Sequence, residues 1–314
     1  MEATSESVIT ARELTRTFGK YAAVNQMSLT IDRGEIFGLV GPDGAGKTTT
    51  LRLLAGILRP TNGAASVAGY DVRKNPEAIK NHIGYMAQQF SLYGDLTVME
   101  NLRFFADIYQ VSAADRQARI PRLLQFSRME RFANRRAGQL SGGMQKKLGL
   151  ACTLIHQPEV IYLDEPTTGV DPVSRREFWD ILTELHMDGI SIVVSTPYMD
   201  EAERCSRIGL MFNGKLIACD TPVAIQGMVQ GEMLEIQPAE LNGSAKLVAS
   251  VPGVQEVQTY GDLLHVFVDS AKRRIDAVRA ALENSGHPVL WMRTSAPRME
   301  EAFIHLIRKQ QGVG

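Results

Sequence analysis

The sequence has 314 residues, of which 44% are apolar, and its formal net charge is −1. This length suits one large domain or two smaller ones, and the near-neutral charge excludes an overall basic surface for nucleic acid. Cys152, Cys205 and Cys219 fit no metal-binding spacing, so we expect reduced, packed thiols. The first seven residues are polar and acidic, unlike a signal peptide, and no apolar run is long enough to span a membrane. We therefore expect a cytoplasmic chain that reaches a membrane only through a partner.

Strand-like and helix-like segments alternate along most of the chain. Alternating apolar positions predict two strands within residues 8–31, and a Gly-Asn-rich turn precedes another short strand. The apolar runs predict strands at 35–40, 64–68, 83–89, 160–163 and 190–195, and a hairpin at 208–219. The spacing of apolar residues predicts helices at 49–55, within 97–136, and at 141–155, 178–185 and 199–205. This alternation indicates an α/β fold, a mainly parallel sheet wrapped by helices.

The pattern changes after Gly231. Strands are predicted at 233–237, 254–259, 263–268 and 289–292, and helices at 245–251, 275–282 and 299–307. The order βαββαβ plus a final helix is typical of a small ferredoxin-like α+β module. We therefore place one domain at residues 1–228 and an accessory module at residues 229–314.

The stretch at residues 41–48 of the first domain fits G-x-x-x-x-G-K-[ST], the motif of the phosphate-binding loop. It follows a predicted strand and precedes a predicted helix, which is the context this motif needs and which argues against a chance glycine turn. Lys47 is expected to reach the β- and γ-phosphates of a nucleotide, and the Thr48 hydroxyl to bind Mg²⁺. The predicted nucleotide-binding residues of this stretch are Gly41, Pro42, Asp43, Gly44, Ala45, Gly46, Lys47, Thr48 and Thr49.

Two further motifs follow in the chain. Asp164 and Glu165 end the apolar run 160–163, where Asp164 can bind the same Mg²⁺ and Glu165 can polarise an attacking water. Alone, such an acidic pair is more often a solvated turn. The stretch Leu140-Ser141-Gly142-Gly143 opens a helix with an N-cap and bare N–H groups, which can bind an anion but is also a common plain helix cap.

These motifs, in this order over residues 8–228, resemble the ATP-binding subunits of ABC transporters. The resemblance implies a P-loop NTPase fold of ABC type, with an antiparallel N-terminal β part and a helical subdomain at 91–139. It also implies ATP and Mg²⁺ as cofactors, and two subunits paired head to tail as a homodimer or heterodimer. Met144 in the signature, residues 198–205 and residues 297–303 resemble the daunorubicin-resistance type of bacterial export ATPase.

The resemblance also assigns roles to single residues. Phe18 falls at the aromatic position that stacks on adenine, although a lone Phe here could be a core residue. Gln88 falls on the glutamine that touches Mg²⁺, with Gln89 as the alternative in register. Ser141, Gly142 and Gly143 would close over the ATP of the opposite subunit, which Asp171 would meet. The implied catalytic residues are Glu165, Gln88 and Lys47, and the implied metal ligands are Thr48, Gln88 and Asp164.

One position departs from the family pattern. The family places a histidine that contacts the γ-phosphate after Ser195-Thr196, and this chain has Pro197, which offers neither a side-chain donor nor an N–H. This puts full hydrolytic competence in doubt, but not ATP binding.

We therefore expect an ATPase, peripheral on the inner face of the cell membrane, that drives a separate permease in the export of drugs or other amphiphiles, with no nucleic-acid partner. The alternatives are a catalytically weak regulatory subunit beside a competent partner, and a soluble ABC protein without a transport role.

Overall fold

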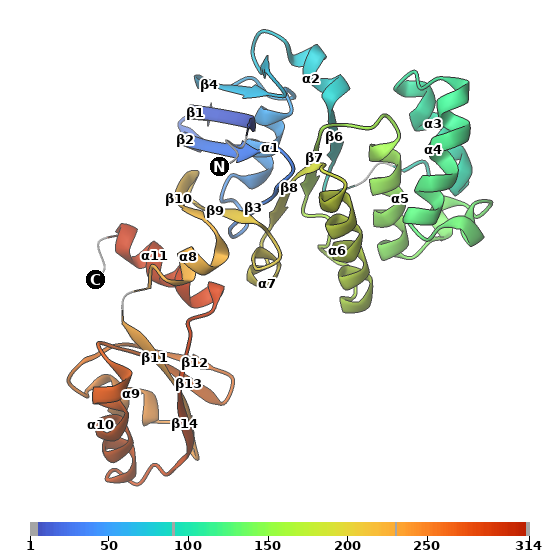
Figure 1. The fold of residues 1–314 in the computed structure, drawn as a ribbon. Coiled ribbons are helices and arrows are strands. Elements are labelled where there is room, and N and C mark those ends of the chain that lie inside the picture. The colour runs from blue at the N-terminus through green and yellow to red at the C-terminus, as the bar shows by residue number, and fades with distance from the viewer. Residues whose placement is uncertain (1–5, 90–91, 230, 312–314) are drawn as a thin grey trace, which may run out of the picture. The chain divides into compact units, whose positions relative to one another are not determined.

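The computed structural model describes residues 6–89, 92–229 and 231–311. The chain forms two compact units, one ending at Pro222 and one beginning at Val223 (Figure 1). None of the helices in these described ranges has the length and apolar character needed to cross a membrane. Cys152 and Cys205 are buried and all three cysteines, which lie within the described ranges, are free.

The first unit begins with an antiparallel sheet in the order β2-β1-β4-β5. Its first two strands form a long hairpin in which Phe18 pairs with Tyr21 beside the turn. Buried and exposed side chains alternate in the second half of β2, as expected for a sheet with one face against a core, whereas β1 buries residues in pairs and its pairing with β2 shifts register. The bounds are β1 Ser7–Phe18, β2 Tyr21–Asp32, β4 Asn62–Val67 and β5 Tyr70–Asp71.

The second sheet of this unit has the order β10-β9-β3-β8-β7-β6. Every pairing in it is parallel except that of β10 with β9. All residues of β3, β7 and β8 are buried, which explains their continuous apolar runs. The bounds are β3 Ile36–Val40, β6 Ile83–Met86, β7 Val160–Asp164, β8 Ser191–Thr196, β9 Arg207–Phe212 and β10 Lys215–Asp220.

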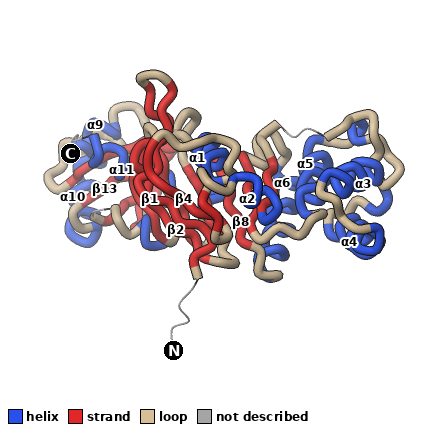
Figure 2. Tube along the Cα trace, turned by 90° about the horizontal axis from the view of Figure 1, so that it is seen from above, coloured by secondary structure: helices blue, strands red, loops and turns tan. Residues whose placement is uncertain are grey.

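The helices of the first unit fall into two groups. The helices α1 Lys47–Leu54, α2 Pro76–His82, α6 Pro172–Met187 and α7 Met199–Ala202 belong with the two sheets. Leu51, Leu53 and Leu54 of α1 are buried in a core that contains residues of both sheets. The helices α3 Val98–Ile108, α4 Ala113–Phe126 and α5 Gly142–Leu154 share a separate apolar core. Figures 1 and 2 show these three helices grouped together, apart from β1, β2 and β4.

The second unit contains the sheet β12-β13-β11-β14, in which every pairing is antiparallel. Alternate residues of β11 and β13, including Leu234, Ile236, Leu264 and Val266, share an apolar core with α9 and α10. The intervening residues Glu235 and His265 are also buried but contact Glu301 of α11 and arginines instead. The bounds are β11 Glu232–Pro238, α9 Ser244–Ala249, β12 Val254–Tyr260, β13 Leu263–Val268, α10 Ala271–Glu283, β14 Val289–Ser295 and α11 Met299–Gln311, with α8 Pro222–Gln226 at the boundary between the units.

The predicted fold class is confirmed, but several helices differ in extent from the prediction or were not predicted. The helix expected at 275–282 begins at Ala271, and the helix expected at 299–307 continues to Gln311. The helix expected at 178–185 begins at Pro172, because Asp171 caps it and Pro172 occupies its first turn. The helix expected at 199–205 ends at Ala202. Helices α2 and α8 were not predicted, since each is short and buries only one residue, Ile79 and Ile225 respectively, so neither shows an apolar period.

Candidate functional site

The phosphate-binding loop, residues 41–48, connects β3 to α1. The loop is anchored at its start by the Gly41 N–H, which donates to the Thr196 carbonyl at 3.2 Å. At its end Gly46 has a φ of 105°, and an added Cβ there would lie 2.3 Å from the Ala23 carbonyl oxygen, so only glycine fits. The loop borders a hollow of about 360 Å³. Residues 43–49, Gln88 and Glu165 are among those that line it, so the structure brings these predicted residues together.

Lys47 is the most constrained charged residue of the hollow. Its ammonium donates to the carbonyls of Gly41 and Pro42 at 2.8 and 3.1 Å. It also lies 3.1 Å from Glu165 Oε1, and both side chains are buried. The lysine is thus held against its own loop by three oxygen acceptors, one of which is a carboxylate.

The two acidic residues at the end of β7, Asp164 within the strand and Glu165 just after it, point to different partners. Asp164 Oδ1 accepts hydrogen bonds from Thr48 Oγ1 at 2.9 Å and Ser195 Oγ at 2.8 Å. Its other oxygen accepts from the Tyr85 hydroxyl at 3.2 Å. Burial, with the nearby charge of Asp164, raises the pKa of Tyr85 to about 12, so this phenol stays a donor at neutral pH. Glu165, in a left-handed backbone conformation with φ of 48°, turns away toward Lys47.

Gln88 follows β6 and reaches the same carboxylate. Its side-chain N–H donates to Glu165 Oε2 at 2.8 Å. Both Gln88 and its neighbour Gln89 are exposed, but of the two only Gln88 lines the hollow. The geometry therefore favours Gln88 over Gln89 as the glutamine of the site.

The side chains around Thr48 suit Mg²⁺. Mg²⁺ prefers oxygen ligands and usually keeps several waters while taking few protein ligands beside substrate phosphates. The Thr48 hydroxyl and the Asp164 carboxylate provide two such oxygens, already within 2.9 Å of each other. Within the described residues, no group of three His, Cys, Asp or Glu forms a metal cage.

The signature residues lie apart from this hollow. Ser141 caps α5, accepting from the Met144 N–H at 3.4 Å. Asp171 caps α6, and the N–H groups of Ser174 and Val173 lower the pKa of its carboxyl. Gly142 instead borders a separate hollow of about 270 Å³ that also includes Gln88 and Lys146. Ser141, Gly143 and Asp171 line neither the first hollow nor this one.

Phe18 and Pro197 also lie outside the lining of the first hollow. Phe18 is 47% exposed, and the Arg16 guanidinium lies 4.6 Å from its ring centre. Its exposure argues against a core phenylalanine. Pro197 lies between β8 and α7, where the Tyr198 N–H donates to Thr196 Oγ1 at 3.0 Å. Among the described residues that line the hollow there is no histidine that could take the place of the missing one.

Sequence analysis assigned no role to four residues that the structure brings to the site. Tyr21 lines the hollow and donates to the Gly44 carbonyl at 3.3 Å. Tyr85 and Ser195 hold Asp164, and Lys146 donates to the Gln88 carbonyl at 2.7 Å. Tyr21 could have been noticed as a second aromatic beside Phe18. The other three depend on contacts between segments far apart in the chain, for which the sequence carries no signal.

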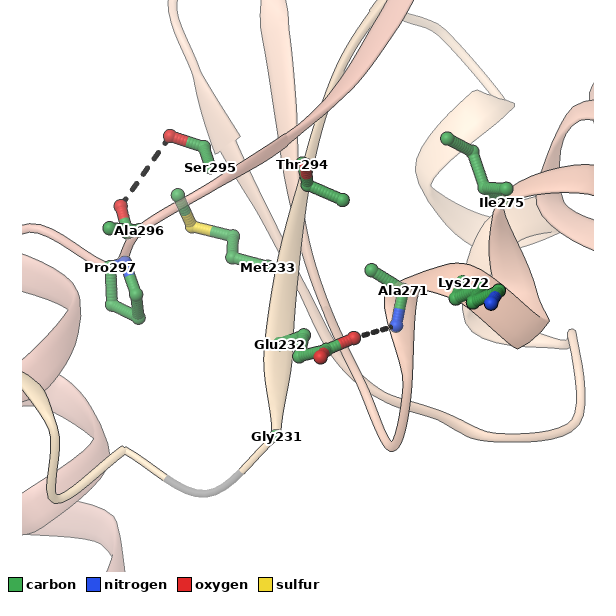
Figure 3. A pocket seen from close by; sticks show the side chains of 10 residues that line it. All are labelled: Gly231, Glu232, Met233, Ala271, Lys272, Ile275, Thr294, Ser295, Ala296 and Pro297. Atoms are coloured by element: carbon green, nitrogen blue, oxygen red, sulfur yellow. Dashed lines mark hydrogen bonds between the residues drawn. The ribbon is translucent and has the colours of Figure 1, made fainter.

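A larger hollow, of about 540 Å³, lies in the second unit (Figure 3). Residues Glu232, Ala271 and Thr294 are among those that line it. Glu232 is the acidic residue of this lining, and its carboxylate accepts a hydrogen bond from the N–H of Ala271 at the start of α10. Its charge is thus used within the fold, so size alone does not make this hollow the site.

Comparison with known proteins decides the family. A model of the ABC transporter family matches residues 24–168. The Nod factor export ATP-binding protein I of Ralstonia nicotianae is 32% identical over 308 residues, which is 98% of this chain and 95% of that protein. This chain belongs to the ABC transporter ATP-binding family.

Two other relatives place it more closely within that family. The daunorubicin resistance ATP-binding protein DrrA2 of Streptomyces coeruleorubidus is 32% identical and is covered over 94% of its length. The probable multidrug ABC transporter ATP-binding protein YbhF of Escherichia coli is 46% identical over 217 residues, or 69% of this chain. The chain spans only 38% of the length of YbhF. The predicted resemblance to the daunorubicin-resistance type is thereby confirmed.

Solved ABC ATPases share the fold. The ATP-binding subunit of an ABC transporter superposes with a TM-score of 0.64 at 30% identity, covering 70% of this chain and 92% of that one. A dimeric structure of the bacterial ABC transporter cassette MJ0796 gives 0.62 at 28% identity, covering 68% and 98%. These matches support the ABC type of the P-loop fold.

Proposed function

We propose that this chain is an ATP-binding and ATP-hydrolysing subunit that pairs with a second such subunit and powers a separate membrane permease. The observation that carries the proposal is the arrangement around the phosphate-binding loop. Lys47 and Glu165 lie within 3.1 Å and Thr48 and Asp164 within 2.9 Å, all at one edge of the parallel sheet. That edge is where open α/β sheets bind ligands.

Each residue has a distinct task in this proposal. Lys47 binds the β- and γ-phosphates, leaving Glu165 as it does so, and the loop N–H groups hold phosphate oxygens. Thr48 and Asp164 hold Mg²⁺, which when bound neutralises phosphate charge. Glu165, whose second oxygen accepts a hydrogen bond from Gln88, then orients and deprotonates the attacking water. Phe18, exposed at the end of β1, is available to stack on the adenine.

A second subunit completes the proposed site. Ser141 and Gly142 are exposed at the start of α5, and no part of this chain's own phosphate-binding loop lines the hollow beside them. Bare N–H groups at a helix start bind phosphate well. A head-to-tail pair would bring these residues and Asp171 to the nucleotide of the partner, and MJ0796 has been solved as a dimer.

The names of the relatives support the proposed cargo of the permease. Proteins named for multidrug transport, daunorubicin resistance and Nod factor export point to the export of drugs or other amphiphiles. The helical subdomain at 91–139 is the part we expect to dock on the permease, and residues 229–314 form an accessory module. The absence of the γ-phosphate histidine favours a second candidate, a catalytically weak subunit that pairs with a competent partner.

Two measurements test the proposal. The purified chain, with and without the permease encoded beside it, should release phosphate from ATP, and Glu165→Gln should abolish this release while keeping ATP binding. Co-purification from detergent extracts should recover the permease with the native chain. Absence of both activity and a membrane partner would leave a soluble ABC protein without a transport role as the better interpretation.

Pro197 is expected to make hydrolysis slow. Loss of one donor to the charge that spreads over the γ-phosphate typically costs on the order of 10²–10³ in rate. Pro197→His should therefore raise kcat by roughly tenfold or more and leave ATP affinity little changed. An unchanged kcat in a folded variant would mean that another group already supplies the donor or that a different step limits turnover.

A further inference from the structure

Lys146 connects the signature helix to the glutamine of the site. It lies near the start of α5, three residues after Gly143, and its ammonium donates to the main-chain carbonyl of Gln88 at 2.7 Å in an exposed hydrogen bond. The side chain of that same glutamine donates to Glu165 at 2.8 Å. A single residue, Gln88, is therefore held at its main chain by the signature helix and at its side chain by the acidic residue of the site.

We propose that Lys146 is a positioning residue that holds the Gln88 main chain so that the Gln88 amide meets Glu165, which makes the orientation of Glu165 depend on the signature helix of the same subunit. The contacts run from Lys146 through Gln88 to Glu165, and from Glu165 to Lys47 at 3.1 Å. This inference rests on the proposed function, in which Glu165 orients water.

The environment of Lys146 is suited to this contact. A charged donor makes a stronger hydrogen bond to a carbonyl than a neutral one, and Gln88 itself is exposed, so its main chain needs such an anchor.

The next residue provides a matched control. Lys147 has the same side chain and is one position further along α5, but its ammonium pairs with Glu177 of α6 and is buried. Adjacent helical residues point in directions about 100° apart. Replacing each lysine by methionine removes the same charge and donor from the same helix, and only one of the two replacements affects Gln88.

The first test reads the position of Gln88 without any turnover. Hydrogen exchange is measured on the full-length, nucleotide-free chain. Lys146→Met should speed exchange at the side-chain amide of Gln88, which donates to Glu165 at 2.8 Å, whereas Lys147→Met should not. Lys146→Arg, which keeps a cationic donor and guards against a misfolded methionine variant, should restore slow exchange. Equal exchange in all variants would overturn the proposal, whether or not the protein hydrolyses ATP.

The second test is a double-mutant cycle on kcat at saturating ATP. Losing an exposed charged hydrogen bond should lower kcat by roughly threefold to tenfold. Because Lys146 acts through Gln88, Lys146→Met should lower kcat little further in a Gln88→Ala background, while Lys147→Met should combine with Gln88→Ala multiplicatively. Multiplicative losses for Lys146 would overturn the proposal. If Lys146→Met changes the exchange but the native chain shows no ATPase activity, the result would count against the proposed function alone.

Discussion

The Lys47–Glu165 pair makes Glu165→Gln a test of the nucleotide-free site as well as of catalysis. Both side chains are buried and lie 3.1 Å apart. Removing one partner of a fully buried ion pair costs about 3–5 kcal/mol. Lys47 keeps its two carbonyl acceptors at 2.8 and 3.1 Å, and the new amide oxygen can still accept, so we expect a loss of about 1–2 kcal/mol instead. For a unit of this size that corresponds to a fall in Tm of roughly 2–8 °C.

ATP should reverse that loss, because its phosphates supply Lys47 with the negative charge that the variant lacks. In the native chain the phosphates must displace Glu165 from Lys47, whereas in the variant they displace only a neutral amide. A gain of about 1.4 kcal/mol in binding corresponds to a tenfold lower Kd for ATP. The Tm rise on adding ATP should therefore be larger for Glu165→Gln than for the native chain at the same ATP concentration.

The assay is thermal unfolding of both proteins with EDTA and with saturating Mg-ATP, followed by gel filtration in ATP, where the non-hydrolysing variant should elute as a dimer. Gln88→Ala serves as the control, since it removes a neutral partner of Glu165 and leaves the Lys47 contact in place. If Glu165→Gln changes neither the Tm in EDTA nor the rise in Tm caused by ATP, the Lys47–Glu165 ion pair does not stabilise the nucleotide-free protein, and the reasoning is refuted. A variant that stays monomeric in ATP, when the native chain dimerises, would refute the catalytic role of Glu165.

Three further predictions concern other parts of the chain. Lys47→Ala should weaken ATP binding by roughly tenfold or more through loss of a charged contact to the phosphates; calorimetry showing native affinity would exclude that contact. A chain ending at residue 228 should fold and bind ATP, because the first unit has its own sheets and core; loss of the folding transition would show that residues 229–314 complete it. Burial tends to raise the pKa of Glu235, but its hydrogen bond from Arg293 lowers it below the ordinary value of 4.5. The ionised carboxylate therefore stabilises the fold above about pH 4.5, and this stabilisation is lost as the pH falls through the lowered pKa. Glu235→Gln should flatten the dependence of Tm on pH below about pH 4.5, and an unchanged slope would contradict the assignment.

Motifs held within one short segment were predictable from the sequence. The phosphate-binding loop needs only the strand before it, the helix after it and a glycine at φ of 105°, all encoded within residues 36–54. The N-cap of α5 is equally local, because Ser141 caps its own helix. The ferredoxin-like order of the second unit followed from period-two and helical patterns in strands and helices of ordinary length.

Contacts between distant segments could not be predicted in this way. Nothing in the sequence around Gln88 indicates that Lys146 will hold its carbonyl, or that its side-chain N–H will donate to Glu165. The same holds for Ser195 beside Asp164, which depends on the parallel pairing of β7 with β8. Asp171, in contrast, carried a local signal that the prediction did not use. It was assigned only to a contact with a partner subunit, but it also caps α6, and recognising this N-cap would have placed the start of α6 correctly.

The pairing of β3 bears on how the protein is made. Ile36 of β3 lies in register with Ile192 of β8, and Phe37 with Arg207 of β9. On the ribosome these partner strands emerge long after β3, and at about 5–20 residues per second the delay is roughly 8–30 s. Throughout that interval the apolar strand that carries the phosphate-binding loop has neither of its sheet neighbours, and Gly41 lacks the Thr196 carbonyl that anchors it. The native setting of the phosphate-binding loop can therefore form only after β8 has left the exit tunnel.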